Sequence, residues 1–152
     1  AARTFGVDAY FVVTPYADQR RLVDEITGHW RQGYGASYNP ARKDALSLVR
    51  LADDLAAVIK VMGDECGQPP LVVATSAKKS KAGVGYQALR QKIAAGRPTL
   101  LLFGTAHGLA PEATAMADAI LPPIYGAGEY NHLSVRSAAA IILDRLLGTA
   151  RD

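Results

Sequence analysis

One glycine-rich segment has the composition of a ligand-binding loop. It reads Phe103-Gly104-Thr105-Ala106-His107-Gly108-Leu109 and follows an apolar run. Glycine lets a backbone approach a ligand closely, and ligands of parallel sheets bind at the carboxyl ends of the strands. The segment is therefore a candidate binding loop. A plain strand-to-helix turn is the structural alternative, since a glycine-rich turn alone is weak evidence.

Basic side chains gather in two places that could contact a nucleic acid. The first holds Lys78, Lys79 and Lys81, and in the second Arg42 follows Tyr34 and Tyr38. Lysines bind phosphates without sequence choice, and aromatic rings stack on bases. A solvated loop and a turn packed by its own tyrosines are the alternatives. The net charge of +3 permits an RNA partner but does not require one.

The histidines and the single cysteine do not suggest a metal site. His29, His107 and His132 lack the spacing to acids or cysteine that zinc sites show. Cys66 alone can form neither an internal disulfide nor a four-cysteine zinc site. We therefore expect no metal.

Short apolar runs alternate with segments of helical periodicity along the chain. This alternation predicts an α/β fold, with a mostly parallel sheet and helices on both faces. We expect strands at residues 10–14, 71–75, 99–103 and 119–121, and helices at 17–30, 42–62, 86–95 and 134–147. A helical turn should begin at Pro111, and Ser134 should cap the last helix. Residues 1–152 are expected to form one domain.

Several common classes are excluded. The 152 residues are 49% hydrophobic and 20% charged, which is typical of a globular chain and not of a disordered one. No apolar run approaches the roughly 18 residues of a membrane span. The segment after the first strand contains no glycine, so the G-x-G-x-x-G fingerprint of dinucleotide-binding folds is missing there. A P-loop is also absent.

Three segments, in the right order and spacing, resemble the motifs of the SpoU–TrmD (SPOUT) RNA methyltransferases. Ala2-Arg3-Thr4-Phe5-Gly6-Val7 is similar to the tail of the first motif, and residues 103–109 resemble the second. The third motif is matched by Ile120-Leu121-Pro122-Pro123-Ile124-Tyr125-Gly126, by Glu129-Tyr130-Asn131-His132-Leu133-Ser134-Val135 and by Ala138-Ala139-Ala140-Ile141. The match is to a bacterial family in which some members are fused behind a tRNA guanine-N1 methyltransferase.

The resemblance implies a fold, a cofactor and partners. The family fold carries a C-terminal deep trefoil knot that holds S-adenosylmethionine (SAM), and family members are cytoplasmic homodimers that act on RNA without a membrane partner. The final helix, with Ala138 and Ala139, would lie in the dimer interface. A first strand upstream of residue 1 is expected to be missing. The resemblance assigns the cofactor pocket to Thr75, Phe103, Gly104, Thr105, His107, Gly108, Leu121, Pro122, Ile124, Gly126, Asn131, Leu133 and Val135.

Arg3, His132 and Ser134 are the expected catalytic set. In relatives, the arginine that matches Arg3 is assigned to proton removal from a ribose 2′-hydroxyl. A guanidinium is a poor base, so we expect Arg3 to grip a phosphate and orient the ribose. His132 could accept the proton or serve as a structural donor near the helix start. We expect Lys78, Lys79, Lys81 and Arg42 to contact RNA.

Two departures from the family pattern concern the substrate side. The second motif is one residue shorter and lacks its glutamate, with Ala106-His107 in that region. His132 stands where the third motif usually has asparagine. We expect methylation of a tRNA ribose 2′-oxygen. The alternatives are a base-nitrogen methyltransferase, which would usually have an aspartate near the last helix, and a knotted RNA-binding or dimerisation module without activity.

Overall fold

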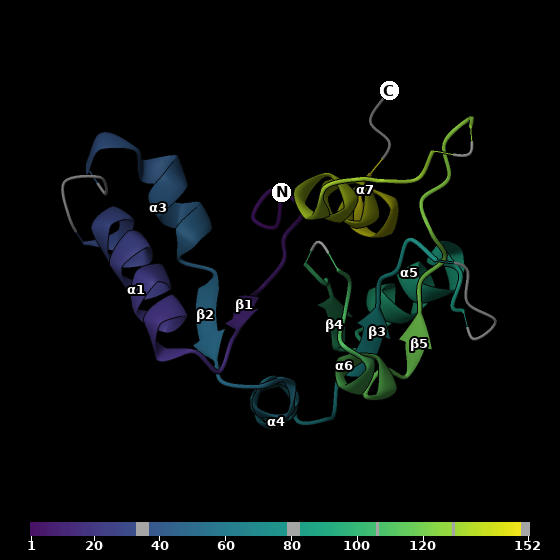
Figure 1. Cartoon of the computed structure of the whole chain (residues 1–152), viewed down its shortest axis with the longest axis horizontal. Helices are drawn as coiled ribbons and strands as arrows, with labels where there is room; N and C mark the ends of the chain where they lie inside the picture. The colour runs from purple at the N-terminus through teal and green to yellow at the C-terminus, as the bar shows by residue number, and fades with distance from the viewer. Residues whose placement is uncertain (33–36, 79–82, 106, 129, 150–152) are drawn as a thin grey trace. The chain divides into compact units, whose positions relative to one another are not determined.

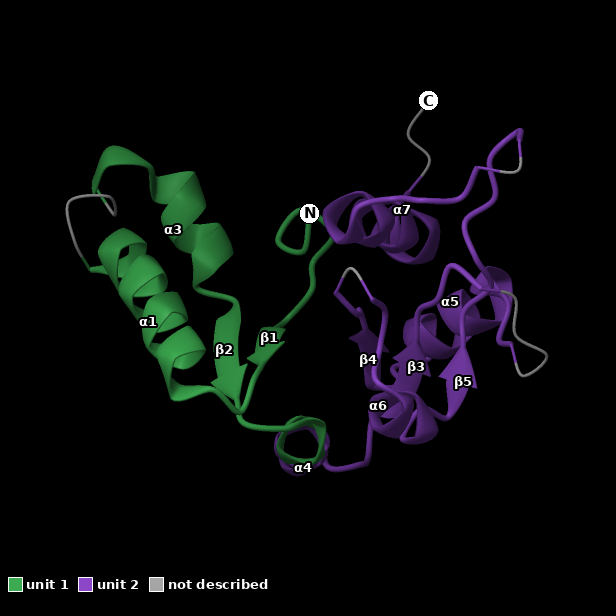
Figure 2. Ribbon diagram, viewed as in Figure 1, with its two compact units in different colours: residues 1–58 green, residues 59–152 purple. Residues whose placement is uncertain are grey.

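The computed structural model describes residues 1–32, 37–78, 83–105, 107–128 and 130–149. The described chain divides into two compact units, residues 1–58 and 59–152 (Figure 2). The first unit contains β1 (Tyr10–Val13), α1 (Ala17–Arg31), α3 (Pro40–Leu46) and β2 (Val49–Ala52), and α4 (Leu55–Cys66) crosses the boundary. The second contains β3 (Leu71–Ala74), α5 (Tyr86–Ala94), β4 (Thr99–Leu102), α6 (Pro111–Ala115), β5 (Ala119–Ile120) and α7 (Val135–Leu147).

In the first unit, two parallel strands are accompanied by two helices that pack together (Figure 1). Tyr10 of β1 is in register with Val49 of β2. The guanidinium of Arg31, at the end of α1, donates to the carbonyls of Leu46 and Val49 at 2.8 and 2.5 Å. The bond to Leu46 satisfies a carbonyl that the end of α3 leaves without a helical partner, and the bond to Val49 ties α1 to the first residue of β2.

The single helix expected over residues 42–62 is wrong. The region forms α3, then β2, then α4. Apolar residues there recur at helical spacing, but Val49–Ala52 form a parallel ladder with β1, and this pairing overrides the periodicity. The Asp54 carboxylate accepts the N–H of Ala57 at 2.7 Å, which favours a new helix start at that point.

The second unit is built on a parallel sheet with the order β4-β3-β5 (Figure 1). The four expected strands and their parallel pairing are thus confirmed, but β1 pairs with the additional strand β2 in a sheet separate from that of β3, β4 and β5. One face of the sheet is covered by α5 and α7. The core there contains Val73, Leu89, Leu121, Ile142 and Leu146, each at most 4% exposed. A helical cover on the opposite face stays a prediction.

The end of β5 is bonded on both sides to one continuous segment of the chain. Leu121 donates its N–H to the carbonyl of Ala74 at 2.9 Å, at the end of β3. On the other side, Val84 donates its N–H to the carbonyl of Ile120 at 3.0 Å, next to a parallel bridge between Gly83 and Ile120. The chain that leaves β3 therefore returns on the far side of β5.

None of the described helices is both long enough and apolar enough to cross a membrane.

Candidate cofactor and RNA site

The β4–α6 loop is a tight turn that requires its two glycines. An antiparallel bridge joins Thr105 to Gly108, which has a positive φ of 85°. A Cβ added to Gly104 would lie 2.2 Å from the carbonyl carbon of Gly108 and 2.4 Å from the nitrogen of Leu109. Position 104 therefore has no room for any other residue in this conformation, and the turn is built from backbone.

The loops after β3, β4 and β5 begin at neighbouring strand ends. Thr75 donates both its N–H and its hydroxyl to the carbonyl of Leu102, at 3.1 and 2.7 Å. The side-chain amide of Asn131 donates to the carbonyl of Ala77 at 3.0 Å, which links the β5–α7 loop to the β3–α5 loop. The structure thus brings together three segments that the motif comparison assigns to one pocket.

Apolar side chains lie under these loops. Leu121 is 1% exposed and belongs to the core, against which Phe103 and Ile124 pack. The Tyr86 hydroxyl donates to the carbonyl of Pro122 at 3.4 Å. A nucleoside cofactor needs apolar contact for its base and polar backbone atoms at close range. The Gly104–Gly108 turn and the residues around Leu121 fit that requirement, so they suit SAM.

Residues 132–135 of the third motif lie at the surface. Leu133 and Val135 are 47% and 42% exposed. The His132 ring lies edge-on to that of Tyr130, with centroids 5.3 Å apart. The Ser134 hydroxyl accepts the N–H of Ser137 at 3.2 Å, so the expected cap of α7 is confirmed. Gly126 is also exposed.

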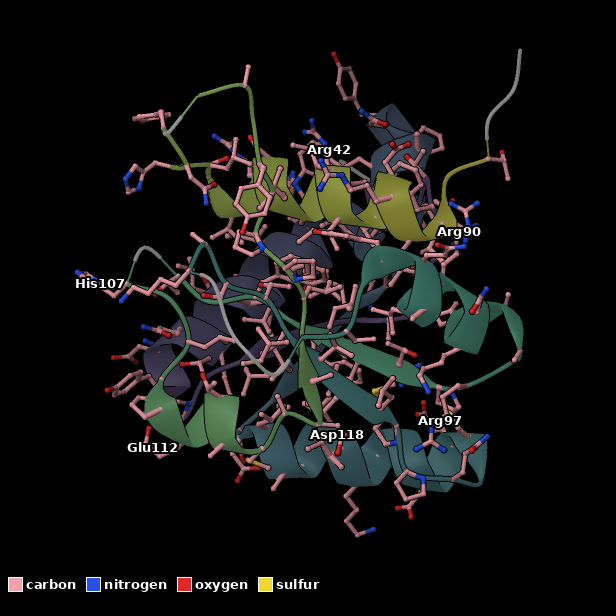
Figure 3. The ribbon with its side chains drawn as sticks, turned by 90° about the vertical axis from the view of Figure 1, so that its right-hand side faces the viewer. Arg42, Arg90, Arg97, His107, Glu112 and Asp118 are labelled. Atoms are coloured by element: carbon pink, nitrogen blue, oxygen red, sulfur yellow. The ribbon has the colours of Figure 1, made fainter. Side chains whose placement is uncertain are left out.

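His107 projects from the β4–α6 loop into solvent (Figure 3). Two other residues predicted to bind the cofactor use their side chains for hydrogen bonds within the protein. The Thr75 hydroxyl donates to the carbonyl of Leu102 on the neighbouring strand, and the Asn131 amide donates to the β3–α5 loop. All of these cofactor assignments stay predictions.

Arg3 belongs to the first unit. Its Nε donates to Asp44 Oδ2 of α3 at 2.7 Å, and both side chains are about half exposed, at 53% and 55%. Sequence reasoning missed Asp44, because it lies 41 positions from Arg3 and inside a segment read as one long helix. No local pattern signals such a pair.

The predicted RNA contacts differ in their surroundings. The guanidinium of Arg42 lies 4.4 Å from the centroid of the Trp30 ring, a cation–π geometry. Lys78 is exposed beside the β3 end, and its N–H bonds Ser76 Oγ at 3.0 Å. Lys79, Lys81 and Tyr34 lie outside the described residues. Within the described ranges, no three histidine, cysteine or acidic side chains are grouped so as to hold a metal ion.

Residues 1–148 match the model of a family described as SAM-dependent RNA methyltransferase. The chain belongs to this family. The match covers nearly the whole sequence and confirms the family resemblance seen in the three motifs. SAM is therefore the methyl donor, and RNA methyl transfer is the family's reaction.

Individual relatives agree with this assignment. Two proteins named tRNA (guanine-N(1)-)-methyltransferase, from Oleidesulfovibrio alaskensis and Nitratidesulfovibrio vulgaris, are 48% and 49% identical to 97% and 95% of this chain. The chain spans 34% of the length of each. An uncharacterised protein of Aquifex aeolicus is 42% identical over 99% of this chain and 74% of its own length.

A solved structure supports the fold. A probable methylase family protein from Haemophilus influenzae superposes with a TM-score of 0.61. The superposition covers 95% of this chain and 55% of that protein, at 20% sequence identity. At this identity the likeness concerns the fold alone.

Proposed function

We propose that this family member methylates the ribose 2′-oxygen of a tRNA nucleotide. The observation that carries the choice of ribose over base is the position of the acidic residues. A base-nitrogen methyltransferase needs a group that removes the N–H proton. The loops around the candidate pocket contain a single acid, Glu129, which lies outside the described residues. These loops are residues 75–85, 103–110 and 121–134.

Asp144 of the last helix is badly placed for that task. It follows Val135, the first residue of α7, by nine positions, and at about 1.5 Å per residue this places it about 14 Å along the helix. The candidate pocket precedes the start of α7. A carboxylate so far along the helix does not reach a reacting nitrogen there, which favours the ribose reaction.

The residues of this chain would divide the work as follows. The Gly104–Gly108 turn and the segment from Leu121 to Gly126 would hold SAM, whose sulfonium supplies an already activated methyl group. Arg3 grips a phosphate of the RNA and orients the ribose, since a guanidinium binds phosphate through paired N–H donors. Lys78 adds affinity for phosphate without sequence choice.

A second candidate is methylation of guanine N1. It is favoured by the printed names of the two relatives that are 48% and 49% identical. Because this chain spans only about a third of each of those proteins, the named activity belongs to the whole proteins. The tRNA substrate of our proposal rests on the same two names.

The deciding experiment uses the full chain, total bacterial tRNA and SAM with a deuterated methyl group, followed by nucleoside mass spectrometry. Our proposal expects a labelled 2′-O-methylnucleoside. Labelled 1-methylguanosine would replace it with the second candidate, and the absence of any labelled nucleoside would overturn both.

Arg3→Ala provides a matched test of the assigned role. Because displacement of a substrate by about 1 Å costs about 100-fold in rate, we expect this variant to lose methyl transfer by about that factor. SAM affinity, measured by calorimetry, should stay at the wild-type value. An unchanged rate would remove Arg3 from the mechanism.

We also propose that the second unit carries the family's trefoil knot. The support is the pair of backbone bonds on either side of the β5 end, from Ala74 and from Val84. Ala74 and Val84 are the two ends of one continuous segment of the chain. The chain that continues from Leu121 therefore leaves the sheet between the two ends of that segment. A threaded C-terminal segment would produce this arrangement.

A homodimer is the proposed assembly. Large apolar side chains are exposed on the segment that leads into α7, among them Tyr125, Tyr130 and Leu133, at 57%, 80% and 47%. Burying such side chains against a second copy would be favourable. Light scattering on the purified chain should give twice the mass of 16.1 kDa, and a monomer at micromolar concentration would contradict the proposal.

A further inference from the structure

The geometry points to Asp44 as a positioning residue that orients the guanidinium of Arg3 for phosphate binding. The inference rests on the proposed function, in which Arg3 contacts RNA. It assigns a role to a side chain that no motif of the chain includes.

The backbone that carries Arg3 is fixed by a short turn. Phe5 and Val7 donate their N–H groups to the carbonyls of Ala1 and Ala2, at 3.1 and 3.0 Å. Gly6 closes the turn with a φ of 71°, a conformation that favours glycine. The Arg3 side chain therefore extends from a defined backbone, and its orientation depends on its own torsions and its partners.

Asp44 extends from an equally defined element. Asn39 caps α3 by accepting the N–H of Arg42 at 3.0 Å. At the other end, Ser47 donates its hydroxyl to the carbonyl of Asp44 at 2.7 Å, and Arg31 bonds the carbonyl of Leu46. Both ends of this short helix are thus anchored, so the Asp44 carboxylate has a fixed base.

The contact between the two side chains uses only one edge of the guanidinium. Asp44 Oδ2 accepts from Nε at 2.7 Å, and no described residue accepts a hydrogen bond from either terminal nitrogen of Arg3. The guanidinium is planar, so one bond at Nε restricts the orientation of the whole group. The two terminal nitrogens are left to bind a phosphate through parallel N–H donors.

Neither stability nor affinity accounts for an acid at this position. Both side chains are about half exposed, and such surface pairs contribute little to folding stability. A carboxylate next to a phosphate-binding group repels the phosphate, so Asp44 lowers the affinity for RNA. What remains for the pair is the orientation of Arg3.

Asp44→Ala should have two separable effects. Removal of the negative charge should leave the KM for tRNA unchanged or lower it. Loss of orientation should lower kcat by about threefold, because an exposed pair restricts a side chain by no more than a few-fold; kcat is measured with saturating bacterial tRNA and labelled SAM. Asp44→Asn keeps an acceptor for Nε, so it should recover most of the lost kcat. A wild-type kcat in Asp44→Ala, or a loss that Asp44→Asn does not recover, would overturn the inference.

A matched control is Asp18→Ala. Asp18 accepts from Arg21 at 2.8 Å in another exposed pair of the same unit, and its removal should leave both constants unchanged. An equal loss of kcat in this control would show that any lost surface pair slows the reaction, and would overturn the role of Asp44.

The double variant separates this inference from the proposed function. If Asp44 acts only through Arg3, adding Asp44→Ala to Arg3→Ala should cause no further loss, because the two effects belong to one interaction. An undiminished rate in Arg3→Ala contradicts the proposed role of Arg3. A slow Arg3→Ala beside a fully active Asp44→Ala contradicts the positioning role alone.

A spectroscopic measurement needs no RNA. The Nε–H resonance of Arg3 should be visible and protected from exchange in the free protein, and Asp44→Ala should remove that protection. Equal exchange of this proton in both proteins would overturn the inference, whatever the substrate is.

Discussion

Gly104 offers a sharp test of the cofactor site, because its substitution acts on backbone alone. In Gly104→Ala, the new Cβ would lie 2.2 to 2.5 Å from atoms of Gly108 and Leu109. Carbon atoms in contact are ordinarily about 3.5 to 4.0 Å apart. The backbone at residues 108 and 109 must therefore retreat by about 1 Å or more. The turn that should face SAM changes shape, while the sheet below it keeps its packing.

The expected loss follows from that displacement. A shift of about 1 Å in a positioned group costs about 100-fold, which corresponds to about 2.7 kcal/mol of binding free energy. We expect the Kd for SAM to rise by about that factor in a titration calorimeter. Circular dichroism on the same sample checks that the variant is folded, since a crowded site costs about 1 to 3 kcal/mol of stability.

Gly63→Ala is the matched control. Gly63 lies inside α4, where an added Cβ would meet only the Cα of Pro69, at 3.9 Å. This variant should bind SAM like the wild type and be somewhat more stable, because alanine favours a helix. A folded Gly104→Ala protein with wild-type affinity for SAM would refute our placement of the cofactor at this turn.

Two further substitutions separate structural from chemical roles in the second unit. Ser134→Ala should lower the free energy of unfolding by about 1 kcal/mol through loss of the α7 cap. Ser134→Asp should restore stability in urea denaturation, and restored methyl transfer as well would show that the serine acts as a cap and not in catalysis. The carboxylate of Asp118 accepts the N–H of Val72 at 2.8 Å, so Asp118→Ala should cost about 1 to 2 kcal/mol. A denaturation midpoint equal to that of the wild type would contradict this account.

The second unit was largely predictable from the sequence. The apolar runs at 71–75, 99–103 and 119–121 became β3, β4 and β5, because continuous apolar strands are typical of a buried parallel sheet. Ser134 capped the last helix as expected. These are local signals, and each is sufficient to indicate its element.

The first unit shows where local signals fail. Val49–Ala52 have an apolar spacing that suits a helix, and only the ladder with β1 makes them a strand. The Arg3–Asp44 pair likewise joins residues 41 positions apart. Long-range pairing is invisible to a periodicity argument. The single domain expected over 1–152 stays a prediction beside the two compact units of the structure.

The backbone bonds on both sides of the β5 end have a consequence for the order of assembly. Ile120 and Leu121 are bonded to residues 84 and 74, which terminate one segment of chain. Because β5 has bonded neighbours on both sides, it cannot be added last to the free edge of a sheet that is already complete. Either the segment closes over β5 after β5 pairs with β3 or, in the knot that we propose, the chain after β5 would be threaded through a loop already in place. In both routes, a late folding step can proceed from only a few conformations of the chain. The same restriction applies to unfolding, so this part of the protein should unfold slowly once it has formed.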